Sequence, residues 1–253
     1  MTTIPSAWRA VASCASTNDL AAAWAREGAP AGAVVIADEQ TSGRGRLGRA
    51  WHSPPGESLY MSVVLRPALP PRRLPPLTLA VAVALAETIA ALGAKPFLKW
   101  PNDVLLHEGA FAKGRKLAGI LTEASVMGSR VEHAIVGIGV NLNTSQFPDE
   151  LEKKATSLLH ALGRTIDRDA FARSLCARLA VWHDKLVDEG ASGILAAWRA
   201  WPSTIGQRVT TTIGERDVNG VAESLDDEGH LWLRSDEGER LRVTAGDVVL
   251  LHS

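Results

Sequence analysis

Hydrophobic spacing divides the chain into a region that mixes helices with strands and a C-terminal region of strands alone. The alanine-rich stretch 20–27 follows Ser16-Thr17-Asn18-Asp19, which supplies an N-cap and an acid, and it stops at Gly28; this predicts a helix. Residues 76–93 are apolar on nearly every side, as expected of a helix packed on a sheet. Leucine, tryptophan and alanine recur three or four apart over about 155–200, which predicts further helices.

Short β-branched and apolar runs flanked by glycine and proline predict strands. They lie at 33–37, 59–65, 97–100, 104–106, 117–126 and 132–143, and their turns favour hairpins over parallel crossovers. Residues 207–251 alternate polar and apolar positions between glycine turns. The pattern predicts an α+β domain over 1–204 and a small all-β barrel over 205–253.

Composition and charge narrow the class of protein. The 253 residues, 46% of them hydrophobic, can bury one good core, which excludes a disordered chain or a disulfide mini-protein. A net charge of −1 provides no general attraction for nucleic acid. Cys14 and Cys176 match no metal or redox spacing, and we expect two buried thiols. Residues 1–10 lack the pattern of a secretory signal and 76–93 falls short of a membrane span, so we expect a cytoplasmic protein.

The loop between the first two predicted strands carries the clearest chemical signal. Gly43-Arg44-Gly45-Arg46-Leu47-Gly48 satisfies G-x-G-x-x-G, but no helix-forming segment follows it, which argues against a dinucleotide site. Three arginines and three glycines within 43–49 suit a small anion, because glycine permits close approach and guanidinium groups bind phosphate or carboxylate. A solvated basic turn and an RNA-binding patch are the alternatives, although no second basic stripe supports the latter.

Other polar residues stand at predicted strand ends. Lys99-Trp100-Pro101-Asn102-Asp103 is ordinary turn chemistry when taken alone, and Lys116 and Asn141 could each simply face solvent. No G-x-S-x-G elbow indicates a serine hydrolase, and the seven histidines show no H-E-x-x-H spacing.

In combination, these segments resemble biotin protein ligases over nearly the whole chain. The matching segments are Ser16-Thr17-Asn18, 38–51, Lys99-Trp100-Pro101-Asn102-Asp103, 116–121 and 137–143, in that order. The resemblance implies an α+β fold of the class II synthetase type, with a mixed, mainly antiparallel sheet, flanking helices and a C-terminal SH3-like β-barrel. It also implies an ATP-dependent ligase that activates biotin as biotinyl-5′-AMP and transfers it to a lysine of a biotin carboxyl carrier protein domain, as in acetyl-CoA carboxylase.

The resemblance assigns roles to thirteen residues. Those that would bind biotin are Ser16, Thr17, Asn18, Gln40, Arg44, Gly45, Arg46 and Lys116. Those that would face the nucleotide are Arg46, Arg49, Trp51, Asn102, Asp103 and Asn141, with Asp103 a candidate ligand of Mg²⁺. The catalytic candidates are Lys116, Arg46 and Arg44, because adenylation needs cations where charge builds on the α-phosphate.

The resemblance leaves several expectations and two rival readings. Only fifteen residues precede Ser16, so we expect a single-function ligase without a DNA-binding domain, as a monomer or homodimer. The chain ends with His252 as the one basic side chain of 248–253, where some members place an arginine near ATP. We expect loop 43–51 to be mobile without ligand. A lipoate or octanoate ligase of the same superfamily and a biotinyl-adenylate sensor that does not transfer are the alternatives.

Overall fold

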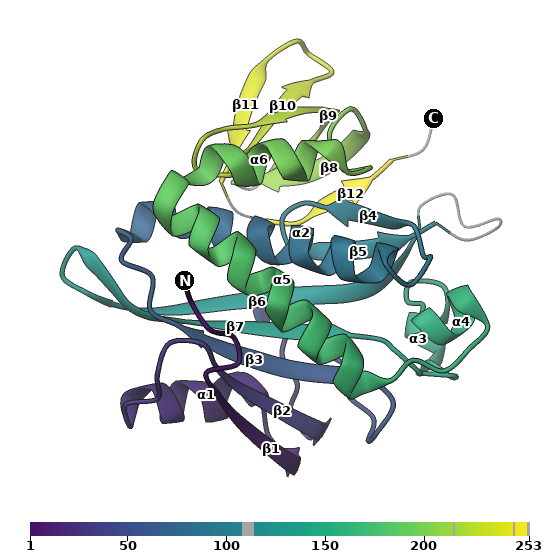
Figure 1. Ribbon diagram of the computed structural model, residues 1–253. Helices are drawn as coiled ribbons and strands as arrows, with labels where there is room; N and C mark the ends of the chain where they lie inside the picture. The colour runs from purple at the N-terminus through teal and green to yellow at the C-terminus, as the bar shows by residue number, and fades with distance from the viewer. Residues whose placement is uncertain (108–113, 215, 245, 252–253) are drawn as a thin grey trace.

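The computed structural model describes residues 1–107, 114–214, 216–244 and 246–251, so His252 lies outside the described residues. It contains a seven-stranded sheet and a five-stranded sheet, with the C-terminal strands at the top of Figure 1. The large sheet has the order β1-β2-β3-β7-β6-β5-β4. Its strands are β1 (Ala7–Cys14), β2 (Ala33–Gln40), β3 (Leu59–Leu65), β4 (Pro96–Lys99), β5 (Asp103–Leu106), β6 (Arg115–Met127) and β7 (Arg130–Val140).

Helices cover both faces of the large sheet. Helix α1 (Thr17–Arg26) packs on β2, β3 and β7 through small residues such as Ala21 and Ala25. Helix α2 (Pro75–Ala90) packs on β4, β5 and β6 and is itself covered by α5 (Arg168–Glu189) and α6 (Ala191–Ala200) (Figure 1). Two short helices, α3 (Asp149–Glu152) and α4 (Leu158–Leu162), follow β7. The main hydrophobic core therefore lies between the sheet and α2.

Helix α2 explains the long apolar run of the sequence. The span Pro71–Ala90 is long and apolar enough to count as a candidate membrane crossing, but 67% of its most apolar window is buried inside the molecule. Burial of aliphatic side chains on every side gives a core helix this composition. The prediction of a buried helix is confirmed.

The C-terminal region is all-β as predicted, and its described strands form an open five-stranded antiparallel sheet rather than a closed barrel. Its strands are β8 (Arg208–Ile213), β9 (Arg216–Leu225), β10 (Leu231–Ser235), β11 (Arg240–Val243) and β12 (Val248–Leu250), in the order β11-β10-β9-β8-β12. All its pairs are antiparallel, and β11 and β12 are the two edges among the described residues. The indole nitrogen of Trp100 donates to the carbonyl of Gly229 at 2.9 Å, which ties this unit to the large sheet.

Strand β1 was not predicted. It pairs with β2 in parallel at the sheet edge, with most of its side chains exposed, so it carries no apolar run.

The prediction that both cysteines are buried is confirmed for one of them. Cys176 is buried in α5, which raises the pKa of its thiol to about 12, whereas Cys14 is half-buried at the end of β1. The hairpin prediction is confirmed for the strand pairs from β4 to β7.

Candidate active site

A cluster of hydrogen-bonded polar side chains lies where α1 begins against the sheet. Ser16 is the N-cap of α1, and Thr17 and Asn18 open the helix with at most 4% of each residue exposed. The side-chain oxygen of Gln40, at the end of β2, accepts from the Thr17 backbone at 2.8 Å and from its hydroxyl at 3.1 Å. Ser62 Oγ on β3 lies 2.8 Å from Thr17 Oγ1 and 2.6 Å from Asn18 Oδ1. Buried side chains linked in this way are held in fixed orientations.

The arginine loop 43–51 belongs to the connection between β2 and β3 and lies beside this polar cluster. It folds back on itself, because the Gly45 amide donates to the Arg49 carbonyl at 2.7 Å and the Trp51 amide donates to the Gly43 carbonyl at 2.9 Å. Leu47 has φ +56° and is exposed, so the tip of the loop contains a residue in the left-handed region. Such a conformation costs about 1 kcal/mol or more in a non-glycine residue.

The three arginines of the loop have partners in three separate parts of the molecule. Arg44 donates to both carboxylate oxygens of Asp19 on α1, at 2.6 and 2.7 Å, and these bonds hold the pKa of the Asp19 carboxyl below its usual range. Arg46 donates to the side-chain oxygen of Asn102 at 3.1 Å. Arg49 forms an ion pair with Asp247 of the C-terminal unit. The guanidinium groups of the loop therefore extend from the start of α1, which Arg44 contacts, to the C-terminal unit, which Arg49 contacts.

Trp51 closes the loop and lies flat on the sheet. A Cβ atom added to Gly139 of β7 would lie 2.5 Å from Trp51 Cε2, and one added to Gly119 of β6 would lie 3.1 Å from Cζ3. The ring therefore rests on bare backbone at two paired positions of neighbouring strands. Its Nε1 is buried and has no hydrogen-bond partner within the described residues. An orphaned donor of this kind suits an acceptor oxygen brought by a ligand.

Lys116 places a compact charge beside this ring. Its Nζ lies 5.2 Å from the ring centroid of Trp51 and 2.7 Å from Asp103 Oδ1. Lys99 Nζ lies 3.7 Å from the other oxygen of the same carboxylate. Asp103 is mostly buried, with 16% of its side chain exposed, so the two lysines compensate its charge.

Asn102 and Asn141 have structural partners in the described residues. The amide of Asn102 donates to the carbonyl of Ile120 at 2.8 Å, which leaves its oxygen for Arg46. The amide of Asn141 donates to the carbonyl of Thr156 at 3.0 Å and, more weakly, to that of Lys116 at 3.4 Å. Asn141 thus holds the segment that positions Lys116.

The carboxylates give a limited set of metal ligands. Within the ranges that the structure describes, no group of three or more histidine, cysteine, aspartate or glutamate side chains could hold a metal ion by itself. Magnesium commonly binds through one or two carboxylates together with substrate phosphates and water, and Asp103 fits that pattern as a single carboxylate. The donor set therefore suits an ion that arrives with a triphosphate.

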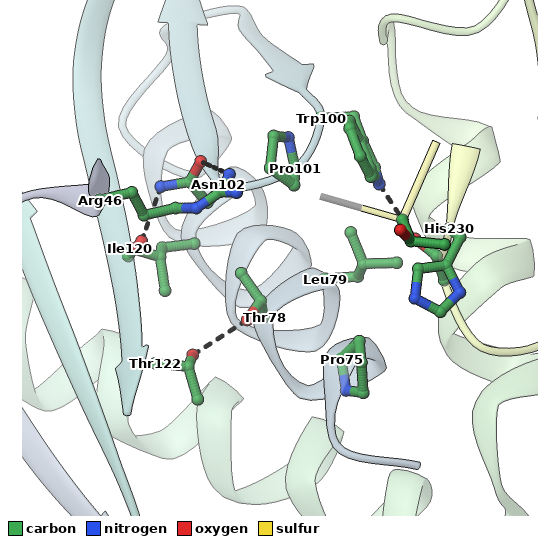
Figure 2. A pocket seen from close by; sticks show the side chains of 12 residues that line it. Arg46, Pro75, Thr78, Leu79, Trp100, Pro101, Asn102, Ile120, Thr122 and His230 are labelled. Carbon is green, nitrogen blue, oxygen red and sulfur yellow. Dashed lines mark hydrogen bonds between the residues drawn. The ribbon is translucent and has the colours of Figure 1, made fainter. Parts of the chain in front are cut away.

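A cavity of about 170 Å³ borders Arg46 and meets the C-terminal unit (Figure 2). Its walls include Arg46 and Asn102 from the site, Thr78 of α2 and Thr122 of β6, and His230 from the C-terminal unit. Figure 2 shows Arg46 turned toward Asn102 at its rim. Arg46 therefore belongs both to the arginine loop and to the wall of this cavity.

The thirteen predicted residues fall into two neighbouring groups. Ser16, Thr17, Asn18 and Gln40 gather at the head of α1. The others lie on the loop, at the turn between β4 and β5, and at the ends of β6 and β7, and they are Arg44, Gly45, Arg46, Arg49, Trp51, Asn102, Asp103, Lys116 and Asn141. Arg44 contacts Asp19 and Glu123 rather than Lys116, so the three catalytic candidates do not form one cluster.

Several further residues of the site were not identified from the sequence. Ser62, Glu123, Gly119 and Gly139 contact predicted residues through the bonds and packing given above, with Glu123 accepting from the Asn18 amide at 2.5 Å. A serine or an acid within an apolar strand gives no signal of its partners. Glycines inside strand patterns do give one, because they mark close approach by another group.

Comparison with known protein families yields two matches. Residues 11–141 match the model of the Biotin/lipoate A/B protein ligase family, and residues 204–251 match that of the Biotin protein ligase C terminal domain. Together the matched segments contain the head of α1, the arginine loop, Lys116, Asn141 and the C-terminal sheet.

Relatives of known name are similar along most of their length. The chain is 41% identical to a biotin–[acetyl-CoA-carboxylase] ligase of Mycobacterium tuberculosis, over 97% of this chain and 91% of the relative. It is 38% identical to a bifunctional ligase/repressor BirA of Bacillus spizizenii, over 93% of this chain and 71% of the relative. The structure of the biotin protein ligase of Aquifex aeolicus in complex with biotin and ATP superposes with a TM-score of 0.81 at 27% identity, covering 98% of this chain and 100% of that one.

Proposed function

Because the chain belongs to the Biotin/lipoate A/B protein ligase family, we propose that it is an ATP-dependent biotin protein ligase. It would activate biotin as biotinyl-5′-AMP and transfer the biotinyl group to a lysine of a carrier domain. The observation that carries the proposal is that the polar cluster at the head of α1 and the ring of Trp51 with Lys116 lie side by side over Gly137 and Gly139 of β7.

The proposed chemistry has two steps. In the first, a carboxylate oxygen of biotin attacks the α-phosphorus of ATP, a carbon–oxygen–phosphorus anhydride forms and pyrophosphate leaves. In the second, the neutral amine of a carrier lysine attacks the carbonyl carbon, an amide forms, and AMP leaves with the bonding electrons while the amine loses a proton. Both substrates of the first step are anions, so fixed cations must offset their repulsion.

Lys116 and Arg46 are the residues we assign to that task. Lys116 Nζ is held by Asp103 above the sheet, and a phosphate or carboxylate would compete for the same ammonium group. Among the residues that the structure describes, the oxygens at hydrogen-bond distance from Arg46 are the neutral ones of Asn102 and Gly246, while Asp247 lies 3.9 Å away. Because a neutral acceptor is a weaker partner than an anion, Arg46 can transfer to a ligand oxygen at small cost.

The other nucleotide candidates have supporting rather than central roles in this proposal. Trp51 supplies a flat face and an unpaired indole donor, and Arg49 supplies a guanidinium that a phosphate could withdraw from Asp247. Asn102 and Asn141 hold Arg46 and the start of β6 in place. Magnesium, when bound with ATP, would add Lewis-acid stabilisation of the phosphates, and Asp103 is the protein oxygen ligand that we assign to it.

The polar cluster at the head of α1 favours biotin over lipoate or octanoate. We assign it to the ureido ring, the head group of biotin, and call it the head-group pocket. Thr17, Asn18 and Ser62 present buried hydroxyl and amide groups and Gln40 a half-buried amide, which suit the paired N–H groups and the carbonyl of the biotin ureido ring. A dithiolane or alkyl group has no N–H or C=O group to pair with these side chains, so its binding adds no hydrogen bond, whereas each bond to a ureido ring would contribute about 0.5–1.5 kcal/mol. The pocket chemistry therefore supports the biotin assignment.

The substrate protein, the cellular compartment and the division into domains follow from the same proposal. The substrate protein would be a biotin carboxyl carrier domain of acetyl-CoA carboxylase or a related carboxylase, and the reaction would take place in the cytoplasm. Residues 1–204 would form the catalytic domain and 205–253 the C-terminal domain, whose Asp247 pairs with the loop arginine Arg49.

Biotin-dependent exchange of labelled pyrophosphate into ATP tests the proposal. We expect exchange with biotin, none with lipoate, and a loss of about 100- to 1,000-fold in Lys116→Ala, the range found when one preorganised group that stabilises transition-state charge is removed. Exchange with lipoate but not with biotin would favour the other acyl ligase. Tight biotin binding with no exchange would identify a sensor, and the enzyme assignment would be wrong.

A further inference from the structure

Glu123 of β6 contacts two parts of the site at once. One of its oxygens, Oε2, accepts a hydrogen bond from Asn18 Nδ2 at 2.5 Å, and the other, Oε1, lies 3.8 Å from Arg44 Nη2. Asn18 is buried, whereas Glu123 is 46% exposed at the side chain. An exposed carboxylate thus reaches a buried amide at the head-group pocket.

The surroundings of Asn18 select one of the two orientations of its amide. Glu123 and the carbonyl of Leu121, 3.4 Å away, are both acceptors on the β6 side of the amide. On the other side, Ser62 Oγ lies 2.6 Å from Asn18 Oδ1. A flipped amide would place its oxygen against a carboxylate and a carbonyl, where two acceptors would face each other without a proton.

We propose that Glu123 is a positioning residue for head-group recognition, because it holds the Asn18 amide with its nitrogen toward β6 and its oxygen toward Ser62 of β3. This inference rests on the proposed function and extends it to a residue that does not touch the substrate. A carbonyl oxygen has two lone pairs, and Ser62 uses one of them. The second is free to accept an N–H group of a ureido ring.

The packing under Asn18 leaves this orientation little freedom. Gly137 of β7 lies directly beneath the amide, and a Cβ atom at this position would overlap Asn18 Oδ1. The side chain therefore lies flat on the sheet, held by Glu123 at one end and Ser62 at the other. Because Asn18 Oδ1 is fixed as a hydrogen-bond acceptor, the site should bind a head group that donates a hydrogen bond more tightly than one that cannot.

The same carboxylate lies near the arginine loop, but that contact is secondary. Arg44 makes its close, two-bond pair with Asp19, and Glu123 adds only the longer approach. Asp19→Asn should therefore loosen the loop while it leaves the Asn18 amide in place. The two acids have separable effects.

The test is a double-mutant cycle between Glu123 and Asn18, measured by biotin-dependent pyrophosphate exchange. Glu123→Gln keeps the shape of the side chain but offers a donor as well as an acceptor, so it no longer selects one orientation of the Asn18 amide. We expect KM for biotin to rise on the order of tenfold with little change in kcat, as for loss of a charged hydrogen bond. In an Asn18→Ala background, the same change should add almost nothing.

Two further variants keep the outcome interpretable. Glu132→Gln is the matched control, because Glu132 is a similarly exposed acid of β7 that bonds to Ser125 at 2.9 Å, and it should behave as the wild type. Glu123→Asp keeps the charge but shortens the reach, and it should raise KM for biotin in the same direction if Glu123→Gln does not fold.

The outcomes separate this inference from the proposed function. An unchanged KM in both Glu123 variants, or an equal rise with and without Asn18, would overturn the positioning role while the biotin ligase assignment stands. Absence of biotin-dependent exchange in the wild-type protein would overturn the proposed function and this inference with it.

Discussion

Replacing Gly139 with alanine should damage activity without unfolding the protein. The added Cβ would lie 2.5 Å from Cε2 and 2.6 Å from Nε1 of Trp51. Carbon atoms in contact stay about 3.5–4.0 Å apart, so the indole would have to move by roughly 1 Å. Trp51 lies at the end of a loop, so it can move, whereas the strand backbone of β7 lies between β3 and β6 and cannot.

The size of the effect follows from that displacement. A misplacement of about 1 Å in a group that orders the reacting atoms can cost on the order of 100-fold in rate, which is about 2.7 kcal/mol of activation free energy. The loss of stability should be smaller, because the ring leaves one contact and its loop can settle elsewhere. We therefore expect a large effect on exchange and a shift in Tm of at most a few degrees, about 2–4 °C per kcal/mol.

Biotin-dependent pyrophosphate exchange, together with a thermal melt, measures both quantities. Gly193→Ala is the matched control, since a Cβ there would meet only the Glu189 carboxylate at 3.7 Å, an ordinary contact. Gly193 is half-buried on α6, away from the site, so the exchange rate of Gly193→Ala should stay at the wild-type value. Wild-type exchange by Gly139→Ala would refute the argument that Trp51 must lie flat on β7.

Two further predictions concern the loop and pH. The ion pair of Arg44 is partly exposed and worth about 0–1 kcal/mol, so trypsin should cut loop 43–51 of the ligand-free protein and should cut it more slowly with biotin and ATP; equal cleavage would contradict a ligand-ordered lid. His133 is 5% exposed, and its burial in β7 lowers the pKa of its ring below that of an unfolded histidine. Stability from this source is present above the unfolded pKa of about 6.5 and falls as pH drops through the folded pKa, because the unfolded chain binds the proton more readily. His133→Gln should make Tm less sensitive to pH between pH 7 and 5 in a melting series, and an unchanged slope would exclude this histidine as the cause.

Elements with a strong local pattern could be predicted from the sequence. Helix α1 begins at Thr17 after the expected cap Ser16 and ends before Gly28, because alanine spacing and turn residues agree there. Strand β1 could not be predicted in this way: its position depends on parallel pairing with β2 across a helix, and its exposed side chains record no burial. Pairing between distant segments leaves a sequence signal only where it buries an apolar face.

The same distinction separates the parts of the site. Arg46 and Lys116 could be named from the sequence because their segments match a known family, but their present partners could not. Arg46 meets Asn102, fifty-six residues away, and Lys116 meets Asp103 across the pairing of β5 with β6. Those contacts depend on strand register, which includes an irregularity between Val104 and Leu105.

Glycines of β6 and β7 explain why two separate groups of polar residues form a single site. Gly137 and Gly139 are two residues apart on one strand, so both lie on the same face of the sheet, and Gly119 pairs with Gly139 on the neighbouring strand. Asn18 lies on Gly137 and Trp51 lies on Gly139, so the head-group pocket and the cationic groups lie side by side on this face. Larger side chains at these positions would separate them. A glycine at every second position of a central strand is unfavourable for the strand itself, and here it provides the flat surface on which both side chains rest.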